Sequence, residues 1–292
     1  MTVPQLAYAV VTPARNERAN LERLAAAIGA QEQLPETWMI VDDGSDDGTR
    51  ELAQALAAER SWIAWIATGD ASGLLSNGRR EGRALESFRQ GVRSLPRLAD
   101  VVVKVDADTS FEPDYFRRLV GHFAAEPDLG IAGGACYEVE DGRWVRQKVL
   151  ETHPRGASRA YRAACLDAVM TLEARMGWDG LDEVKAALAG YRSRTLLELG
   201  FRHHRLTGGR EKGRMRHGTA QGRAAWYMGY RPSYVLLRTL YRMPSDPGAA
   251  GMVLGYAAAL LTRLPRCPEP DAIRLLRSRQ RLSALVRRGA PP

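Results

Sequence analysis

Cysteine is scarce in this chain of 292 residues, and neither a long apolar run nor a secretory leader pattern is found in it. The cysteines form no C-x-x-C pair, so neither a disulfide scaffold nor a cysteine zinc site is expected. No apolar run reaches the roughly 20 residues that a bilayer-crossing helix needs. The first residues lack the basic, apolar, small order of a signal peptide, and residues 6–11 predict a strand instead. We therefore expect a reducing, cytoplasmic setting. The three cysteines are Cys136, Cys165 and Cys267.

The charge of the chain is unevenly distributed. Hydrophobic residues make up 45% and charged residues 26%, which is typical of a globular protein and excludes wholesale disorder. The net charge is +8, yet residues 200–292 hold 18 Lys and Arg against 4 Asp and Glu, and residues 1–199 hold 24 against 30. This asymmetry predicts an anionic partner for the C-terminal part, such as a membrane surface, a phosphorylated substrate or nucleic acid.

Apolar, β-branched runs alternate with helix-like segments through residue 125. Strands that are apolar throughout and alternate with helices indicate βαβ units and a parallel sheet covered on both faces. The fold class predicted from this pattern is α/β. The expected strands are residues 7–13, 38–41, 63–68 and 100–105, and the expected helices are residues 18–29, 47–60 and 79–95.

The pattern changes after residue 125. Strands are expected at residues 130–140 and 155–164, helices at 165–176 and 180–189, and a loop at 201–222. Aromatic, aliphatic and arginine residues then alternate over residues 219–243. An apolar segment at 247–262 and a basic helix at 270–288 follow. Such amphipathic elements are typical of helices that lie on an anionic, partly apolar surface. A helical subdomain that packs on the core is the alternative.

Acidic residues follow two of the predicted strands. Asp42 and Asp43 come after the second strand, and Asp106 and Asp108 come after the strand at 100–105. In an open α/β sheet the carboxyl ends of the strands form the ligand crevice. Two carboxylates spaced i, i+2 suit a hard divalent cation, which commonly bridges protein carboxylates and substrate phosphates. An acidic turn with a helix cap is the alternative interpretation.

The ordered set of motifs resembles a GT-A glycosyltransferase of family 2. The resemblance covers roughly residues 5–205 and implies a GT-A α/β domain at 1–205, followed by a basic helical C-terminal region at 206–292. The matching motifs are TPARNE at residues 12–17, VDDGS at 41–45, VDAD at 105–108, GASRAY at 156–161 and GWDGLDE at 177–183.

The resemblance implies a nucleotide pocket at the ends of the first two strands. Pro13, Ala14 and Glu17 would line it, with Glu17 facing the ribose or the base. Asp43, together with Asp42, would hydrogen-bond the base. For all of these residues the alternative is a turn or a helix cap at a strand end.

The resemblance also implies a site for Mg²⁺ or Mn²⁺. Asp108 would hold the metal, and Asp106 would meet the metal or the ribose. His203 would complete the metal shell or contact the diphosphate, unless it is an exposed loop residue. Arg83 would contact the diphosphate, with a surface salt bridge as its alternative.

An inverting transferase needs a carboxylate that takes the proton of the acceptor hydroxyl. In the family, this base is the Asp of a Glu-Asp pair about eleven residues before a Gly-aromatic turn. Asp179 stands at that spacing before Gly190, although Trp178 replaces the preceding Glu. Asp182 is the other acid of the same segment. The alternative for both is a helix N-cap or first-turn role.

The function expected from these residues is transfer of a sugar, with inversion, from a nucleotide diphosphate sugar to an acceptor hydroxyl. By resemblance the donor is a UDP-sugar, and the acceptor is a lipid-linked or cell-envelope glycan precursor. The basic C-terminal region is expected to bind an anionic membrane surface on its cytoplasmic face. Nucleic acid is not expected, because no nucleic-acid motif accompanies the basic residues.

Two other functions stay open. One is a non-catalytic protein that binds a membrane or a partner on a degenerate GT-A fold, for which Trp178 leaves room. The other is a nucleotidyltransferase, which would show a Gly-rich phosphate loop after the first strand where this chain has PARNE.

Overall fold

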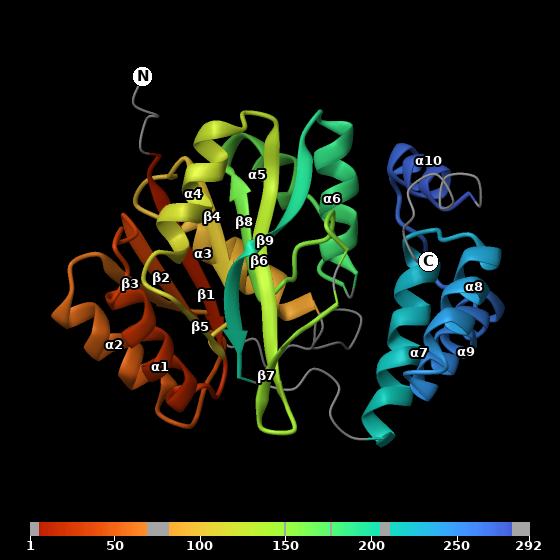
Figure 1. The fold of residues 1–292 in the computed structure, drawn as a ribbon, viewed down its shortest axis with the longest axis horizontal. Coiled ribbons are helices and arrows are strands. Elements are labelled where there is room, and N and C mark those ends of the chain that lie inside the picture. Colours follow the sequence, from red (N-terminus) through yellow and green to blue (C-terminus); the bar gives the residue numbers. More distant parts are fainter. Residues whose placement is uncertain (1–5, 69–81, 149, 176, 205–210, 282–292) are drawn as a thin grey trace. The chain divides into compact units, whose positions relative to one another are not determined.

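The computed structural model describes residues 6–68, 82–148, 150–175, 177–204 and 211–281. The chain forms two compact units (Figure 1). Residues 1–174 and 189–205 make up the first unit, and residues 175–188 and 206–292 make up the second. The segment that carries Asp179 and Asp182 therefore groups with the C-terminal helices, whereas the sequence analysis assigned it to the N-terminal domain.

A nine-stranded mixed sheet forms the first unit, in the order β3-β2-β1-β4-β8-β6-β9-β5, with β7 paired to β6. Four strands on one side of the sheet run parallel, namely β1 (Tyr8–Ala14), β2 (Thr37–Asp42), β3 (Ile63–Ala67) and β4 (Val101–Val105). The remaining strands are β5 (Thr109–Phe111), β6 (Leu129–Glu140), β7 (Arg143–Arg146), β8 (Ser158–Arg162) and β9 (Arg192–His203). In this half the pairs are antiparallel except for β6 and β9, which are parallel.

Helices cover both faces of the parallel strands. Successive side chains of a strand point to opposite faces, so apolar side chains on both faces are buried by helices. Val10 belongs to the main hydrophobic core beside helix α1. Its neighbour Val11 faces helix α3, where a Cβ on Gly91 would lie only 2.4 Å from Val11 Cγ1. The helices of this unit are α1 (Arg18–Gly29), α2 (Thr49–Glu59), α3 (Arg83–Arg93), α4 (Tyr115–Ala125) and α5 (Ala163–Met170).

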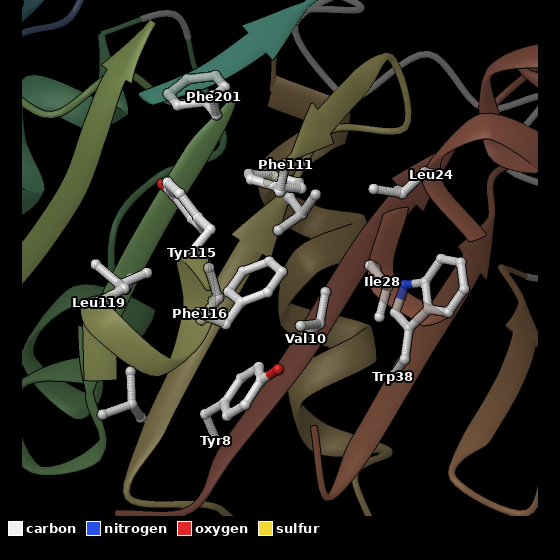
Figure 2. Close-up of a cluster of buried hydrophobic side chains, with 14 of the residues drawn as sticks. Tyr8, Val10, Leu24, Ile28, Trp38, Phe111, Tyr115, Phe116, Leu119 and Phe201 are labelled. Atoms are coloured by element: carbon white, nitrogen blue, oxygen red, sulfur yellow. The ribbon is translucent and has the colours of Figure 1, made fainter. Parts of the chain in front are cut away.

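Aromatic side chains fill the core between α1, α4 and the sheet. Figure 2 shows Phe111, Tyr115 and Phe116 gathered below Phe201, with Tyr8 further along the sheet. The rings of Phe111 and Tyr115 lie 4.6 Å apart, and those of Tyr8 and Phe116 lie 5.3 Å apart. Aromatic pairs at these spacings add to the stability that comes from burial. This packing fixes the strand ends that carry the acidic motifs.

The second unit is helical. Its helices are α6 (Trp178–Leu188), α7 (Glu211–Tyr227), α8 (Pro232–Arg242), α9 (Ala250–Leu261) and α10 (Pro270–Arg279), with a 3₁₀ turn at Pro247–Ala249. Helices α7 and α9 touch backbone to backbone. A Cβ on Gly222 would lie 2.0 Å from the carbonyl oxygen of Met252, and a Cβ on Gly255 would lie 2.0 Å from that of Thr219. Only glycine permits this approach.

The predicted α/β fold with C-terminal helices is confirmed, but the loop predicted at residues 201–222 is wrong. Strand β9 continues to His203, and α7 begins at Glu211. The glycines disfavoured a helix there on propensity, yet Gly218 and Gly222 are the residues that let α7 pack closely against α9. The predicted helix at 270–288 ends at Arg279, and residues 282–292 lie outside the described residues.

Within the described residues, the longest helix is α7 with 17 residues. The most apolar helix, α9, has 12 residues. None of the described helices combines the length and the apolar content that a membrane crossing requires.

Candidate nucleotide and metal site

A pocket of about 510 Å³ opens at the carboxyl ends of β1, β2 and β4. Its volume falls within the range of small-molecule binding sites. Seven residues that the sequence analysis selected line this one pocket. They are Pro13, Ala14, Glu17, Asp43, Arg83, Asp106 and Asp108. Parallel strands bring their carboxyl ends to one edge of the sheet, which is why motifs far apart in sequence meet here.

Hydrogen bonds fasten the loop after β1 to the loop after β2. Asn16 has a positive φ of 55°, a conformation that asparagine adopts more readily than most residues. Its N–H donates to Ser45 Oγ at 3.0 Å, and the N–H of Glu17 donates to Thr49 Oγ1 at 2.9 Å. The Glu17 carboxylate also accepts from Asn20 Nδ2 at 2.6 Å. The Asn-Glu pair of the first motif thus shapes this wall of the pocket.

The two adjacent aspartates after β2 have different surroundings. Asp43 lines the pocket and forms a two-pronged ion pair with Arg83, at 2.7 Å to Nε and 2.8 Å to Nη2. Asp42 is fully buried outside the pocket and accepts from Arg50 Nε at 2.8 Å and from the Ser45 N–H at 3.1 Å. Asp42 therefore holds the turn together, and Asp43 presents its carboxylate to the pocket. Arg83 lies in the pocket but is turned toward Asp43.

A buried lysine accompanies Asp106, and the sequence analysis missed it. Lys104 is 2% exposed, forms an ion pair with Asp106 and donates to the carbonyl oxygen of Gly156 at 2.9 Å. A buried ammonium group needs such partners. Its signal was present in the sequence, because Lys104 is the one charged residue inside an otherwise apolar strand, two positions before Asp106.

Asp108 meets His203 across the β5–β9 pair. Thr109 is opposite His203 in the register, which brings His203 Nε2 to 3.3 Å from Asp108 Oδ1. The other ring nitrogen, Nδ1, lies 3.1 Å from Oε1 of Glu138 on β6. Burial lowers the pKa of His203, but hydrogen bonds and charge from Asp108 and Glu138 outweigh it, so its pKa stands above the ordinary value. The predicted pairing of Asp108 with His203 is thus brought together by the fold.

These groups fit a hard divalent cation. Two ligand atoms bound at about 2.1 Å and at right angles lie about 3 Å apart, close to the 3.3 Å between His203 Nε2 and Asp108 Oδ1. Ligand atoms of Cys136, Glu138 and His203 also lie within 4.8 Å of one another. Burial raises the pKa of the Cys136 thiol to about 12, and its soft sulfur atom suits Mg²⁺ and Mn²⁺ poorly. The oxygen and nitrogen donors suit Mg²⁺ or Mn²⁺.

The neighbouring His204 has a different role. Its Nε2 lies 2.8 Å from Ser110 Oγ, and its ring packs edge-on against Trp144 with centroids 5.3 Å apart. These contacts hold β5 and the β6–β7 hairpin in place. Of the two adjacent histidines, only His203 faces the aspartate of the pocket.

The two candidate bases lie on α6 in the second unit. Asp182 is fully buried, and its Oδ1 accepts from the N–H of Glu183 at 2.6 Å. Asp179 is half-buried in the first turn of the helix. Lys185 of the same helix pairs with Glu269 at 2.8 Å, which ties α6 to the start of α10. Because Asp182 is fully buried and Asp179 is only half-buried, an acceptor can reach Asp179 more easily. The role of Asp179 as the catalytic base stays a prediction.

A family model described as Glycosyl transferase family 2 matches residues 9–169. This match spans the pocket, Asp106, Asp108 and strand β8. The chain belongs to this family. The resemblance identified from the motifs is therefore confirmed, and the α/β sheet described above is the GT-A fold of a family 2 glycosyltransferase.

Two curated relatives are similar over a little more than half of the chain. Polyprenol monophosphomannose synthase of Mycolicibacterium smegmatis is 29% identical over 180 residues, 55% of this chain and 63% of that protein. Undecaprenyl-phosphate 4-deoxy-4-formamido-L-arabinose transferase of Pseudomonas aeruginosa is 31% identical over 182 residues, 57% of this chain and 50% of that protein. The chain thus matches between half and two thirds of the length of these relatives.

Solved structures share the fold over most of the chain. The mannosyltransferase PcManGT from Pyrobaculum calidifontis, in complex with GDP-Man and Mn²⁺, aligns with a TM-score of 0.58 and 18% identity, covering 93% of this chain and 79% of that one. TarS of S. aureus in complex with UDP-GlcNAc aligns with a TM-score of 0.54 and 13% identity, covering 97% and 92%. At these identities the likeness concerns the fold.

Proposed function

We propose that this protein transfers a sugar, with inversion, from a nucleotide diphosphate sugar to a hydroxyl of a polyprenyl-linked or envelope glycan acceptor. The observation that carries the proposal is the pocket in which Asp43, Asp106 and Asp108 converge, with His203 beside Asp108. Asp108 and His203 would hold Mg²⁺ or Mn²⁺, whose charge stabilises the departing diphosphate when it is bound. Asp43 and Glu17 would orient the nucleoside, and a UDP-sugar is the first donor to test.

The names of the two curated relatives specify a polyprenol phosphate or undecaprenyl phosphate, which supports a polyprenyl-linked acceptor but does not specify a hydroxyl as the attacking group. Asp179 would take the proton of an attacking hydroxyl, which is worth about 10²- to 10⁴-fold in rate. A lipid phosphate is mostly ionised at neutral pH and needs no such base. Asp179→Asn therefore separates the two acceptors. A loss of at least 10²-fold supports the hydroxyl acceptor, and an unchanged rate with polyprenyl phosphate points to attack by phosphate oxygen.

Release of nucleoside diphosphate from a panel of UDP- and GDP-sugars, with Mn²⁺ and a polyprenyl-linked acceptor, tests the proposal. We expect one donor to be consumed and Asp108→Asn to abolish its consumption. The matched control is Asp141→Asn, an exposed residue in the β6–β7 turn whose positive φ asparagine accommodates. Nucleotide binding without consumption of any donor would favour the non-catalytic alternative.

The exposed face of helices α8 and α9 supports peripheral attachment to a membrane. Leu236 and Leu240 on α8 and Leu254 and Leu261 on α9 are each more than half exposed. Helix α9 carries no charged residue, so its exposed face is wholly apolar, and exposed arginines follow it at positions 263 and 266. Apolar residues beside arginines suit the interface of an anionic bilayer, where each basic residue adds about 1 kcal/mol.

Co-sedimentation with vesicles tests this attachment. Vesicles that contain anionic lipid are expected to bind the protein, and Leu254→Glu combined with Leu261→Glu is expected to release it. The matched control is Leu98→Glu, an exposed leucine of the first unit. Binding that persists in the double variant would exclude the α9 face as the attachment surface.

A further inference from the structure

Glu138 is a buried carboxylate for which the sequence analysis found no role. It lies on β6, is 4% exposed, and its Oε1 is 3.1 Å from Nδ1 of His203. Arg155 approaches the same oxygen at 3.7 Å, which offsets part of the cost of burying the charge. A buried carboxylate in direct contact with a histidine of the pocket calls for a functional explanation as well as a structural one.

The sheet fixes the relation between Glu138 and His203. Strands β6 and β9 are paired in register at Cys136 with Phe201 and at Tyr137 with Arg202. Glu138 and His203 are the residues that come directly after this last pair on β6 and β9. Groups held on two paired strands keep their geometry better than groups on loops. The sheet pairing therefore places the two side chains beside each other.

The two nitrogens of His203 face two different carboxylates. Nδ1 faces Glu138, and Nε2 faces Asp108 at 3.3 Å. A neutral imidazole carries its proton on one nitrogen and a lone pair on the other. A carboxylate on Nδ1 accepts the N–H there and leaves the lone pair on Nε2. Histidines that ligate metals are commonly oriented in this way by a carboxylate on their second nitrogen.

We propose that Glu138 is a positioning residue that accepts the Nδ1–H of His203 and so leaves Nε2, which lies 3.3 Å from Asp108 Oδ1, to ligate a divalent cation together with Asp108. This inference rests on the proposed function, in which Asp108 holds the cation. It assigns the carboxylate of Glu138 to the ring of His203 and gives it no direct bond to the cation.

Mn²⁺ titration of the full chain, followed by the EPR signal of free Mn²⁺, tests the assignment. Glu138→Ala is expected to weaken Mn²⁺ binding about 10- to 100-fold. Glu138→Gln, whose amide oxygen still accepts from Nδ1–H, is expected to bind closer to the wild type than Glu138→Ala does. In a His203→Ala background, Glu138→Ala is expected to cause no further loss, because the two residues act through one ligand. A further loss of similar size in that background would overturn the positioning role and make Glu138 a direct ligand.

A spectroscopic measurement separates positioning from a merely structural role. In the Mg²⁺-loaded wild-type protein, ¹⁵N NMR of His203 is expected to show the Nδ1–H tautomer. The Glu138→Gln variant is expected to keep the fold of the wild type. The Nε2–H tautomer of His203 in the wild-type protein would overturn the inference. Wild-type protein that binds Mn²⁺ while Glu138→Ala binds it equally well overturns the inference alone. Wild-type protein that does not bind Mn²⁺ overturns the metal-dependent function as well.

Discussion

Removal of Arg83 should destabilise the first unit and change the wall of the pocket at the same time. Arg83 forms an ion pair with the Asp43 carboxylate through Nε at 2.7 Å and Nη2 at 2.8 Å, and the side chains of Arg83 and Asp43 are only 17% and 11% exposed. Thr68 Oγ1 also donates to Asp43, at 3.0 Å. Arg83→Met keeps most of the side-chain volume but leaves a mostly buried carboxylate without its cation. Removing one partner of a fully buried pair costs 3–5 kcal/mol, and the remaining access to water and Thr68 reduce this to about 2–3 kcal/mol.

Differential scanning fluorimetry of the ligand-free protein measures this effect. For a unit of this size, 1 kcal/mol moves Tm by about 2–4 °C, so a decrease of roughly 4–12 °C is expected. The matched control is Arg93→Met on the same helix, since Arg93 is 64% exposed and lies 3.9 Å from Glu86. An exposed pair of this kind contributes at most about 1 kcal/mol.

A double-mutant cycle shows whether the loss comes from the pair itself. Asp43→Asn removes the charge that Arg83 neutralises, so the double variant should be more stable than the sum of the two single effects predicts. We expect a coupling energy of about 1–3 kcal/mol between the two positions. Additive effects, with a coupling below about 0.5 kcal/mol, would refute the reasoning.

Two further predictions concern stability. Gly222→Val should cost about 3 kcal/mol or prevent folding, because a Cβ there meets a backbone oxygen at 2.0 Å. Gly213→Ala on the same helix should stabilise by about 0.5–1 kcal/mol, because no atom of the described residues lies within 4 Å of a Cβ there. Denaturant midpoints test both, and equal effects would contradict the packing. Burial raises the pKa of Glu126, but hydrogen bonds and charge from Arg192 and its neighbours outweigh burial, so this pKa lies below its ordinary value. A hydrogen bond from Arg192 also lowers the pKa of Asp128. Both carboxylates therefore stabilise the fold above about pH 4 and lose that contribution as the pH falls through their lowered pKa values. Urea unfolding at pH 3 and pH 6 should therefore differ less in Arg192→Met than in the wild type, and an unchanged difference would count against this network.

The first half of the fold could be predicted because its signals are local. Helix α1 buries Leu21, Leu24 and Ile28, a spacing that defines one helix face, and β4 is apolar except for Lys104. Strand β9 and helix α7 could not be predicted in the same way. Strand β9 is exposed at its start and buried at Phe201. Helix α7 contains glycines that disfavour a helix in isolation but allow α9 to pack closely against it. Tertiary contact overrode propensity at these places.

The candidate site shows the same division. The strand-end motifs predicted that Asp43, Asp106 and Asp108 share one pocket, because parallel strands end at one edge. No motif marked Glu138, since its relevance comes from the pairing of β6 with β9 and not from its sequence neighbours. Asp42 and Asp43 are adjacent and alike in sequence, and only the structure separates the buried turn residue from the one that lines the pocket.

We propose that the pocket binds a nucleoside diphosphate through a divalent cation at Asp108. The most direct test of this proposal is the Tm of the wild type and of Asp108→Asn with UDP, GDP, dTDP and CMP, each with and without Mn²⁺. A ligand at 100 times its Kd stabilises the folded state by about 2.7 kcal/mol. We predict that one diphosphate raises the Tm of the wild type only when Mn²⁺ is present, and that Asp108→Asn removes this shift. A Tm that no nucleotide changes at millimolar concentration, or an equal shift in Asp108→Asn, would contradict the account.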